Sequence, residues 1–273
     1  MKHLYKFIAL VFIFMIGIAF FSKSIPSISV STTTASSIQD STFPMVYLQV
    51  GESFINPLHG YSSELNSSTV RESITPLDTG KTFAVNIPEN DSKIKKLSYE
   101  LRDIANNKSI ETGDITAFDK NKKYKVATVH LKEAMDTSTE YGFCMTLITN
   151  YSKKIHFYTR IKYYDNDFFL SKKLDFVAKF HAATFDQGRS LDLSQYLESG
   201  TNDDSSYESV DIHSSRKLIT WGKLKPKRLT DVVPTVKELN IETAAISQTY
   251  FVSATTASGS ETYQVKEFYR VRY

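Results

Sequence analysis

The densest cluster of side chains able to do chemistry is the run Asp211-Ile212-His213-Ser214-Ser215-Arg216, close to the only tryptophan, Trp221. It combines an acid, a base and hydroxyls, which are the groups of a nucleophilic triad, although a triad is defined by geometry in space. On a strand, Asp211 and His213 would share one face while Ser214 would point away from it. No Gly-x-Ser-x-Gly elbow of a hydrolase occurs in the sequence. The sequence therefore favours a locally hydrogen-bonded strand end over a catalytic group.

Metal and cofactor chemistry has little support in the sequence. The six histidines, at positions 3, 59, 130, 156, 181 and 213, are never closer than 25 residues apart. Helical metal sites place histidines about one turn apart, so no such pattern is present. Asp203-Asp204 lacks the calcium-loop spacing, and no glycine-rich phosphate motif occurs. We therefore expect no metal and no cofactor, and we expect His181 to be a satisfied core histidine of a helix.

The single cysteine, Cys144, excludes an internal disulfide and a cysteine-based zinc or redox motif. It lies in an apolar, strand-like run, Tyr-Gly-Phe-Cys-Met-Thr-Leu-Ile-Thr. No base is identifiable beside it. We therefore expect a buried, inert thiol rather than a nucleophile.

Two further groups of residues fit ligand binding, although a structural role is the preferred interpretation of each. The loop His59-Gly60-Tyr61, with Glu64 beyond it, could contact a ligand, but a plain turn is the better prediction. The pairs Tyr163-Tyr164 and Phe168-Phe169 could form an aromatic platform for sugars or peptides. We expect them instead to fill the junction between two regions of the fold.

The charge distribution argues against nucleic-acid binding. The formal net charge is +3, and Lys2, Lys6 and Lys23 account for it, which leaves equal numbers of basic and acidic residues in the remainder. A nucleic-acid binder needs a concentrated positive surface to displace counterions from phosphates. A local basic run is predicted to be a solvated loop. That run comprises Lys223, Lys225, Lys227 and Arg228.

The N-terminus carries the strongest localisation signal. Phe7–Phe21 is an unbroken apolar run of 15 residues, and residues 4–24 together are long enough to cross a bilayer with Lys6 and Lys23 near its two surfaces. No clean small-residue cleavage motif follows, so we favour an uncleaved signal-anchor helix over residues 1–26, and a secreted protein if the segment is cleaved. The lysines before the run predict a single-pass protein with its C-terminal region outside the membrane. Residues 27–42, rich in Ser and Thr, are expected to be a flexible linker.

The remaining sequence predicts a β-rich body. Aromatic residues make up 13% of the chain, which favours strands because stiff, flat side chains pack well on a pleated surface. Short runs with partial period-two alternation are separated by turn residues, so we predict an antiparallel β-sandwich-like domain over residues 43–165. The best hairpin candidate joins 141–149 to 155–164. The predicted strands are 45–50, 82–87, 94–101, 124–131, 141–149 and 155–164.

The period changes after residue 165. In Leu170–Phe185, apolar residues recur at spacings of three and four, which predicts an amphipathic helix. A shorter helix is predicted over Leu191–Leu197. Strands are predicted at Tyr207–Ile212, Glu242–Ala254 and Thr262–Tyr273. Residues 166–273 are therefore expected to form an α+β domain of helices packed on an antiparallel sheet.

Six short runs of the sequence between residues 58 and 273 resemble an uncharacterised family of membrane-anchored extracytoplasmic proteins of Gram-positive anaerobic bacteria. The resemblance covers most of residues 43–273 and rests on no motif of known chemistry. It implies a location at the cell envelope and a further β-rich region after residue 273, but no activity. The runs are LHGYSSE (58–64), RESITPL (71–77), FYTRIKYYD (157–165), YLESG (196–200), VDIHSSRKLITWG (210–222) and KEFYRVRY (266–273).

The leading functional hypothesis is a non-enzymatic, membrane-tethered extracytoplasmic protein that binds or scaffolds an envelope protein or polysaccharide. Two other classes stay open, namely a cell-envelope hydrolase or transferase with an unrecognised site, and a sensory ectodomain. If the protein is an enzyme, we expect a pocket that gathers titratable groups such as Asp211, His213 or His59. If it is a binding module, we expect an exposed aromatic patch or an open sheet edge.

Overall fold

The computed structural model describes residues 45–66, 71–89, 94–121, 123–150, 153–198, 206–256 and 259–273. The chain divides into a unit of residues Met1–Thr42 and a compact unit of residues Phe43–Tyr273. The predicted membrane segment and Ser/Thr-rich linker lie outside the described residues. No helix in the described ranges is both long enough and apolar enough to cross a membrane.

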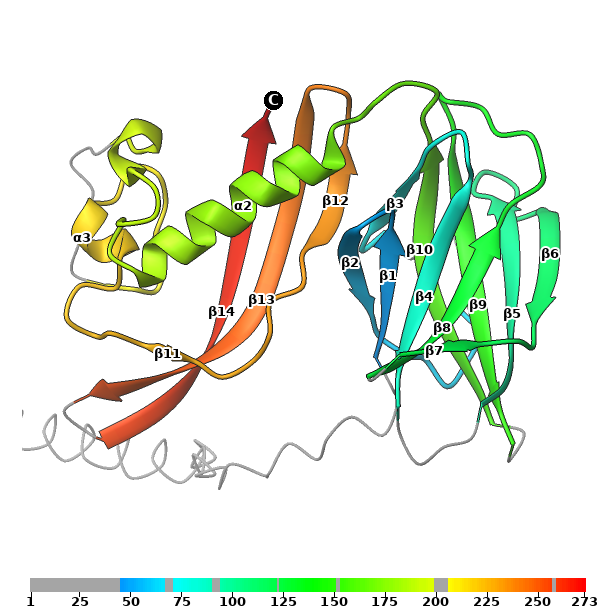
Figure 1. The fold of residues 1–273 in the computed structure, drawn as a ribbon, viewed down its shortest axis with the longest axis horizontal. Coiled ribbons are helices and arrows are strands. Elements are labelled where there is room, and N and C mark those ends of the chain that lie inside the picture. Colours follow the sequence, from blue (N-terminus) through cyan, green and yellow to red (C-terminus); the bar gives the residue numbers. More distant parts are fainter. Residues whose placement is uncertain are drawn as a thin grey trace, which may run out of the picture. The chain divides into compact units, whose positions relative to one another are not determined.

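The described fold is mainly β, with antiparallel sheets, as the sequence predicts (Figure 1). One five-stranded sheet has the order β2-β1-β4-β8-β7, and we call it sheet A. Its strands are β1 (Val46–Val50), β2 (Ser53–Leu58), β4 (Thr82–Pro88), β7 (Asp119–Lys120) and β8 (Tyr124–His130).

A second five-stranded sheet, sheet B, has the order β3-β10-β9-β5-β6. The predicted hairpin is confirmed, because β9 and β10 pair antiparallel in register from Glu140 opposite Lys162 to Ile148 opposite Lys154. β3 departs from the antiparallel expectation by pairing parallel to β10. The strands of sheet B are β3 (Ile74–Leu77), β5 (Ile94–Asp103), β6 (Ser109–Ile115), β9 (Glu140–Thr149) and β10 (Lys154–Tyr163).

Sheets A and B share a hydrophobic core because each presents alternate apolar side chains to the other. Phe83 and Val85 of β4 are almost fully buried, as are Phe143 and Met145 of β9. The Phe83 and Phe143 rings meet edge to face with their centroids 5.3 Å apart. The side chains between these inward positions therefore lie on the outer faces of the two sheets.

Asn56 marks an irregularity in β2 that connects three strands. Pairing with β1 shifts between Tyr47 and Leu48, so Asn56 is the extra residue of a β-bulge, and its φ of 51° lies in the left-handed region. Its buried side chain donates to the Ile74 carbonyl at 2.8 Å and accepts from the Val236 amide at 2.9 Å. The bulge thereby joins β2 to β3 and to β12.

The third sheet, sheet C, carries the predicted long helix on one face (Figure 1). The helix α2 (Leu170–Phe185) has the predicted bounds. Phe180 and His181 of α2 pack on Tyr269 and Tyr250 of the sheet, with ring centroids 5.7 Å and 5.0 Å apart, respectively. The strands of sheet C are β11 (Lys227–Arg228), β12 (Thr235–Leu239), β13 (Thr243–Thr256) and β14 (Gly259–Arg272).

Two predicted elements between α2 and β12 need correction. The predicted helix 191–197 is a single 3₁₀ turn, η1 (Leu193–Tyr196), which begins where the Asp192 side chain accepts from the Ser194 amide. The predicted strand Tyr207–Ile212 is wrong, because these residues form bends and a turn before α3 (Arg216–Ile219). The Asp and Ser side chains of this segment bond their own backbone, which competes with strand pairing.

Candidate functional site

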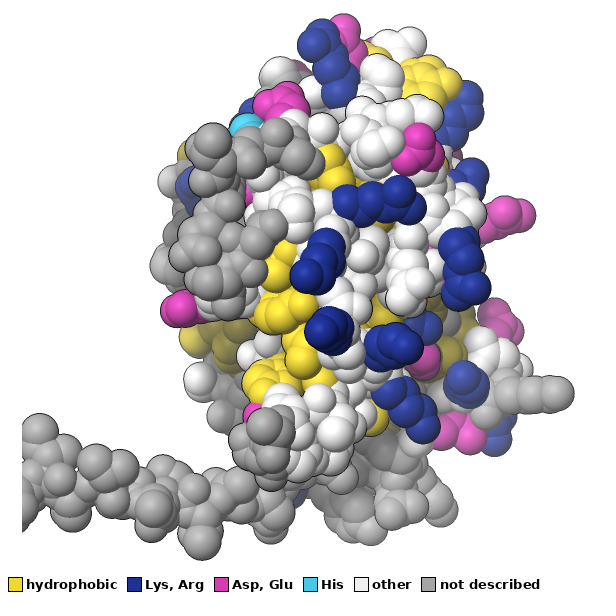
Figure 2. All heavy atoms as spheres, turned by 90° about the vertical axis from the view of Figure 1, so that its left-hand side faces the viewer, with side chains coloured by type: hydrophobic (Ala, Val, Ile, Leu, Met, Phe, Trp, Pro, Cys, Tyr) yellow, Lys and Arg dark blue, Asp and Glu magenta, His cyan; other side chains and the backbone are white. Residues whose placement is uncertain are grey.

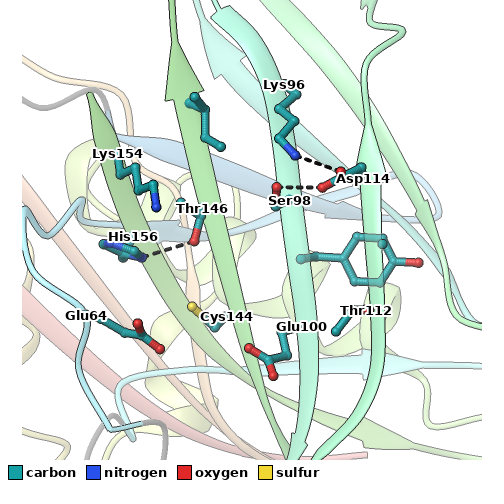
Figure 3. A pocket seen from close by; sticks show the side chains of 13 residues that line it. Glu64, Lys96, Ser98, Glu100, Thr112, Asp114, Cys144, Thr146, Lys154 and His156 are labelled. Carbon is teal, nitrogen blue, oxygen red and sulfur yellow. Dashed lines mark hydrogen bonds and ion pairs between the residues drawn. The ribbon is translucent and has the colours of Figure 1, made fainter. Parts of the chain in front are cut away.

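A pocket of about 570 Å³ lies on the outer face of sheet B, over β5, β6, β9 and β10 (Figure 3). Its lining combines carboxylates, amines, hydroxyls, an imidazole and a thiol. The polar side chains that line it are Glu64, Lys96, Ser98, Glu100, Thr112, Asp114, Cys144, Thr146, Lys154 and His156.

Strand register brings these residues together from distant parts of the sequence. Asp114 lies opposite Ser98, Ser98 opposite Thr146, and Thr146 opposite His156, which forms one polar row across four strands. Residues directly opposite one another in a sheet project to the same face. The row therefore forms a continuous hydrogen-bonding surface over sheet B.

A second row runs alongside it and contains the cysteine. Glu100 lies opposite Cys144, and Cys144 lies opposite Tyr158. The Tyr158 hydroxyl is hydrogen-bonded to the thiol and accepts the Leu65 amide at 2.7 Å. The second row is thus anchored to the loop that follows β2.

That loop forms one side of the pocket. The backbone of Tyr61 forms two hydrogen bonds with the backbone of His156, at 2.8 and 2.9 Å, and its ring meets the Tyr158 ring at 5.8 Å. Glu64 then lies in the pocket lining, whereas His59 is exposed and is not part of it. The structure therefore brings Glu64 into the pocket lining, places Tyr61 against His156 and Tyr158, and leaves His59 outside.

The carboxylates of the pocket are paired with cations. The Lys96 amine lies 2.7 Å from Asp114, and this contact holds the pKa of Asp114 below its usual range. Arg102 reaches Glu64 at 3.0 Å and Glu100 at 2.5 Å. Burial alone raises the pKa of Glu100, but hydrogen bonds from Arg102 and Ser109 outweigh it and lower that pKa. Asp114 and Glu100 are therefore ionised at pH 7, and Glu64 and Glu100 share the single cation Arg102.

The two groups that could act as nucleophile and base are both held in their neutral forms. Burial raises the pKa of the Cys144 thiol to about 11. Burial also lowers the pKa of His156, whose Nδ1 is hydrogen-bonded to the Thr146 hydroxyl at 3.0 Å. Because the thiolate is the nucleophilic form of cysteine, this environment disfavours thiol chemistry near pH 7. The arrangement is suited to hydrogen bonding with a polar ligand.

The sequence cluster at residues 211–216 forms a turn and the start of α3, not the predicted strand end. The Asp211 carboxylate accepts the His213 amide at 2.9 Å, and the Ser214 hydroxyl accepts the Asp211 amide at 3.1 Å. The His213 ring lies 3.3 Å from the Glu198 carbonyl. Ser215 caps α3 by accepting from the Leu218 amide. Each side chain therefore has a local structural role.

His181 belongs to a buried network between α2 and sheet C. Its Nδ1 lies 2.9 Å from the Glu267 carboxylate, and Arg228 reaches its Nε2 at 3.3 Å. The Tyr250 and Tyr269 hydroxyls donate to the same carboxylate at 2.7 and 2.9 Å. His181 is buried and hydrogen-bonded at both ring nitrogens, as a satisfied core histidine should be.

The remaining predicted groups are structural or exposed. Tyr164 and Phe168 are buried with their rings 4.8 Å apart, and the Tyr164 hydroxyl donates to the Leu239 carbonyl at 2.6 Å, so this pair fills a junction. Phe169 stacks on Tyr273. The basic run at 223–228 is exposed, with its last two residues in β11. The pair at 203–204 lies outside the described residues.

Sequence reasoning missed most of the pocket lining. Lys96, Ser98, Thr146 and His156 are the outward positions of strands that were themselves predicted. The period-two alternation of those strands could have identified them as one polar face. The order of the strands in the sheet, which the sequence does not show, is what places them side by side.

Comparisons with known proteins add no functional assignment. No protein-family model matches the chain, and no curated protein matches it. Within the described ranges, no group of three or more His, Cys, Asp or Glu side chains is arranged to hold a metal ion.

Proposed function

We propose that this protein is a membrane-tethered extracytoplasmic binding protein without catalytic activity, and that the pocket on sheet B is its ligand site. The tether is residues 4–24, and the body formed by residues 43–273 lies outside the membrane. The observation that carries the proposal is the polar pocket itself, in which the carboxylates are ion-paired and the thiol is neutral.

The proposed ligand is an uncharged, hydroxyl-rich molecule, which at the cell envelope means a saccharide. Ser98, Thr112 and Thr146 offer hydroxyls, and the ion-paired carboxylates keep unused lone pairs that accept hydrogen bonds. A strongly charged ligand would have to compete with the ion pairs that Lys96 and Arg102 already make. The lining of the pocket is mostly polar, so a ligand there would be held chiefly by hydrogen bonds.

The test uses the full-length protein in detergent micelles, titrated by calorimetry with linear N-acetylglucosamine oligomers, which are uncharged and rich in hydroxyls. Thr112 is an exposed pocket residue on the edge strand β6, so Thr112→Trp should fill the pocket without disturbing the core. We expect it to weaken saccharide binding tenfold or more, which corresponds to about 1.4 kcal/mol. The matched control is Thr128→Trp, at an exposed position on the outer face of sheet A, which should leave binding within twofold.

Three outcomes would contradict the proposal. One is that no saccharide binds, and another is that Thr112→Trp and Thr128→Trp bind equally well. The third is conversion of a probe to a product after incubation, detected by chromatography, because it would show an enzyme. Thermal melting of both variants checks that each is folded.

A further inference from the structure

β14 is an edge strand that leaves one whole side unpaired within the described residues. It pairs with β13 residue by residue, from Gly259 opposite Thr256 to Arg272 opposite Thr243. No described strand pairs with its other side. A long edge of this kind presents a row of free backbone donors and acceptors to any extended chain.

The hydrogen-bond pattern identifies which residues face outward. The Tyr273 amide donates to the Glu242 carbonyl at 2.7 Å, which continues the β13–β14 register by one pair. In an antiparallel ladder the bonded pairs alternate with unbonded ones. Odd-numbered residues of β14 therefore direct their N–H and C=O groups to β13, and even-numbered residues direct theirs to the open edge.

The same even-numbered residues carry a basic side-chain row on the sheet face opposite α2. Lys266, Phe268 and Arg270 lie on this face, whereas Glu267 and Tyr269 point to the α2 side and bond there. Phe268 is 64% exposed. Figure 2 views the side of the molecule on which α3 and β14 lie in Figure 1, and it shows Lys and Arg side chains gathered across the centre of the face with hydrophobic ones beside them.

Neighbouring strands add charges of both signs beside this row. Burial lowers the pKa of Lys237 of β12, Glu72 raises it, and Lys266 and Arg160 lie near enough to lower it further. Glu238 of β12 lies opposite Ala245, which lies opposite Arg270, so one acid shares the face. Arg160 already pairs with Glu140. No ion pair with Lys266 or Arg270 is found among the described residues. The edge therefore offers two uncompensated cations beside an exposed phenylalanine.

We propose that the open edge of β14 is a docking site for an extended segment of a partner protein in which acidic and apolar side chains alternate. The segment would add to sheet C as a further strand, so backbone hydrogen bonds would supply affinity and the cationic row would select the acidic side chains. The pairing needs no conformational change in the described strands.

Charge argues against a second copy of this chain as the occupant. Antiparallel pairing of two β14 strands about a two-fold axis places even-numbered residues of both copies on one face. Lys266, Arg270 and Arg272 of one copy would then lie opposite or diagonal to the same cations of the other. Like charges in those positions are destabilising, whereas an acidic strand neutralises them.

The test measures binding of a fluorescent octapeptide of alternating glutamate and valine to the full-length protein in detergent micelles by anisotropy. We expect saturable binding that Arg270→Glu weakens tenfold or more, and that weakens as salt is raised from 50 to 300 mM because these charges are exposed. The lysine–valine octapeptide should not bind. A glutamate–valine peptide N-methylated on its glutamates should not bind either, because in antiparallel pairing the glutamates lie opposite the even-numbered residues and their N–H groups are the ones that bond to β14.

A second experiment tests backbone pairing from the side of the protein, by comparing peptide binding to Gln264→Pro with peptide binding to Gln264→Thr. The Gln264 amide points to the open edge, so proline removes a docking donor without removing a bond to β13. Proline should weaken peptide binding tenfold or more, and threonine should not.

Equal binding of the glutamate and lysine peptides, or full binding of the N-methylated peptide, would overturn the proposal. Dimers that Gln264→Pro abolishes in sedimentation would also overturn it, in favour of self-pairing. Thr112→Trp should leave peptide binding unchanged, which separates this site from the saccharide pocket.

Discussion

At the scale of single residues, Cys144 combines a central position in the pocket with a suppressed reactivity. It is 6% exposed, and the Tyr158 hydroxyl is hydrogen-bonded to it. A neutral thiol at this position can lie against an uncharged ligand without adding a charge that must be desolvated. The residue therefore fits a binding surface better than a reaction centre.

We predict that Cys144 reacts with iodoacetamide at pH 8 on the order of 100-fold more slowly than an exposed cysteine, because a pKa of about 11 leaves little thiolate. The rate should keep rising from pH 8 to 11. The comparison is the double variant Cys144→Ala/Thr128→Cys, in which the reaction rate of the exposed thiol should level off near pH 9. Mass spectrometry of the alkylated protein measures both, and equal rates at pH 8 would refute the prediction.

The same shift affects stability at high pH. The unfolded thiol ionises near its ordinary pKa, whereas the folded thiol ionises only near 11. Its contribution to stability is therefore complete below pH 8 and is lost as pH rises from about 8.5 to 11. The raised pKa of Tyr158, to about 12, adds a loss of the same sign above pH 10. As pH rises from 7 to 11, the wild type should therefore lose more of its free energy of unfolding than Cys144→Ala does.

At the scale of elements, the buried amine of Lys173 ties α2 to the turn between β12 and β13. It donates to the carbonyls of Phe168, Asn240 and Ile241 at 3.0, 2.7 and 2.7 Å. Burial lowers the pKa of this amine. The three bonds set where the first turn of the helix meets sheet C.

Lys173→Met should lower the free energy of unfolding by about 2 kcal/mol, because buried carbonyls lose their donor. Lys179→Met, at an exposed position of the same helix, should change it by less than about 0.5 kcal/mol. Urea unfolding followed by the fluorescence of Trp221 measures both variants. Equal midpoints for the two variants would show that the amine does not anchor the helix.

Strong periodic signals in the sequence predicted their elements well. The helix Leu170–Phe185 follows from apolar residues spaced three and four apart. The hairpin of β9 and β10 follows from the period-two alternation of its strands. β2 and β3 were missed because each contains a proline, Pro57 and Pro76, that breaks the pattern, and because the Asn56 bulge resembles a turn. β2 forms a short hairpin with β1, whereas β3 pairs with β10, which is far away in sequence, so no local pattern records the pairing of β3.

The pocket was less predictable than the elements that form it. Asp114 lies on β6, which was not predicted, since its exposed and partly exposed residues lack a buried apolar face. Cys144 was correctly interpreted as buried, and its neighbour Tyr158 lies on the other strand of the predicted hairpin, but its neighbour Glu100 comes from a strand far away in sequence. The sequence thus indicated single outward residues but not the surface they form together.

At the scale of the whole molecule, hydrogen bonds join sheet C to sheets A and B within residues 43–273. Asn56 donates to β3 and accepts from β12, and Arg160 of β10 donates to the Lys237 carbonyl at 3.0 Å. The division into domains at 43–165 and 166–273 stays a prediction. The proposed saccharide pocket and the proposed docking edge of β14 are built from different sheets, so the two proposed sites do not overlap.

The placement of this body outside the membrane is the claim on which both proposed partners depend. A membrane-impermeant maleimide tests it on intact Gram-positive cells that express full-length Cys144→Ala/Thr128→Cys, in which the only thiol is exposed on sheet A. We predict that intact cells are labelled as fully as lysed cells and that the labelled chain stays with the membrane fraction. Labelling that appears only after lysis would place the body in the cytoplasm and rule out the proposed location.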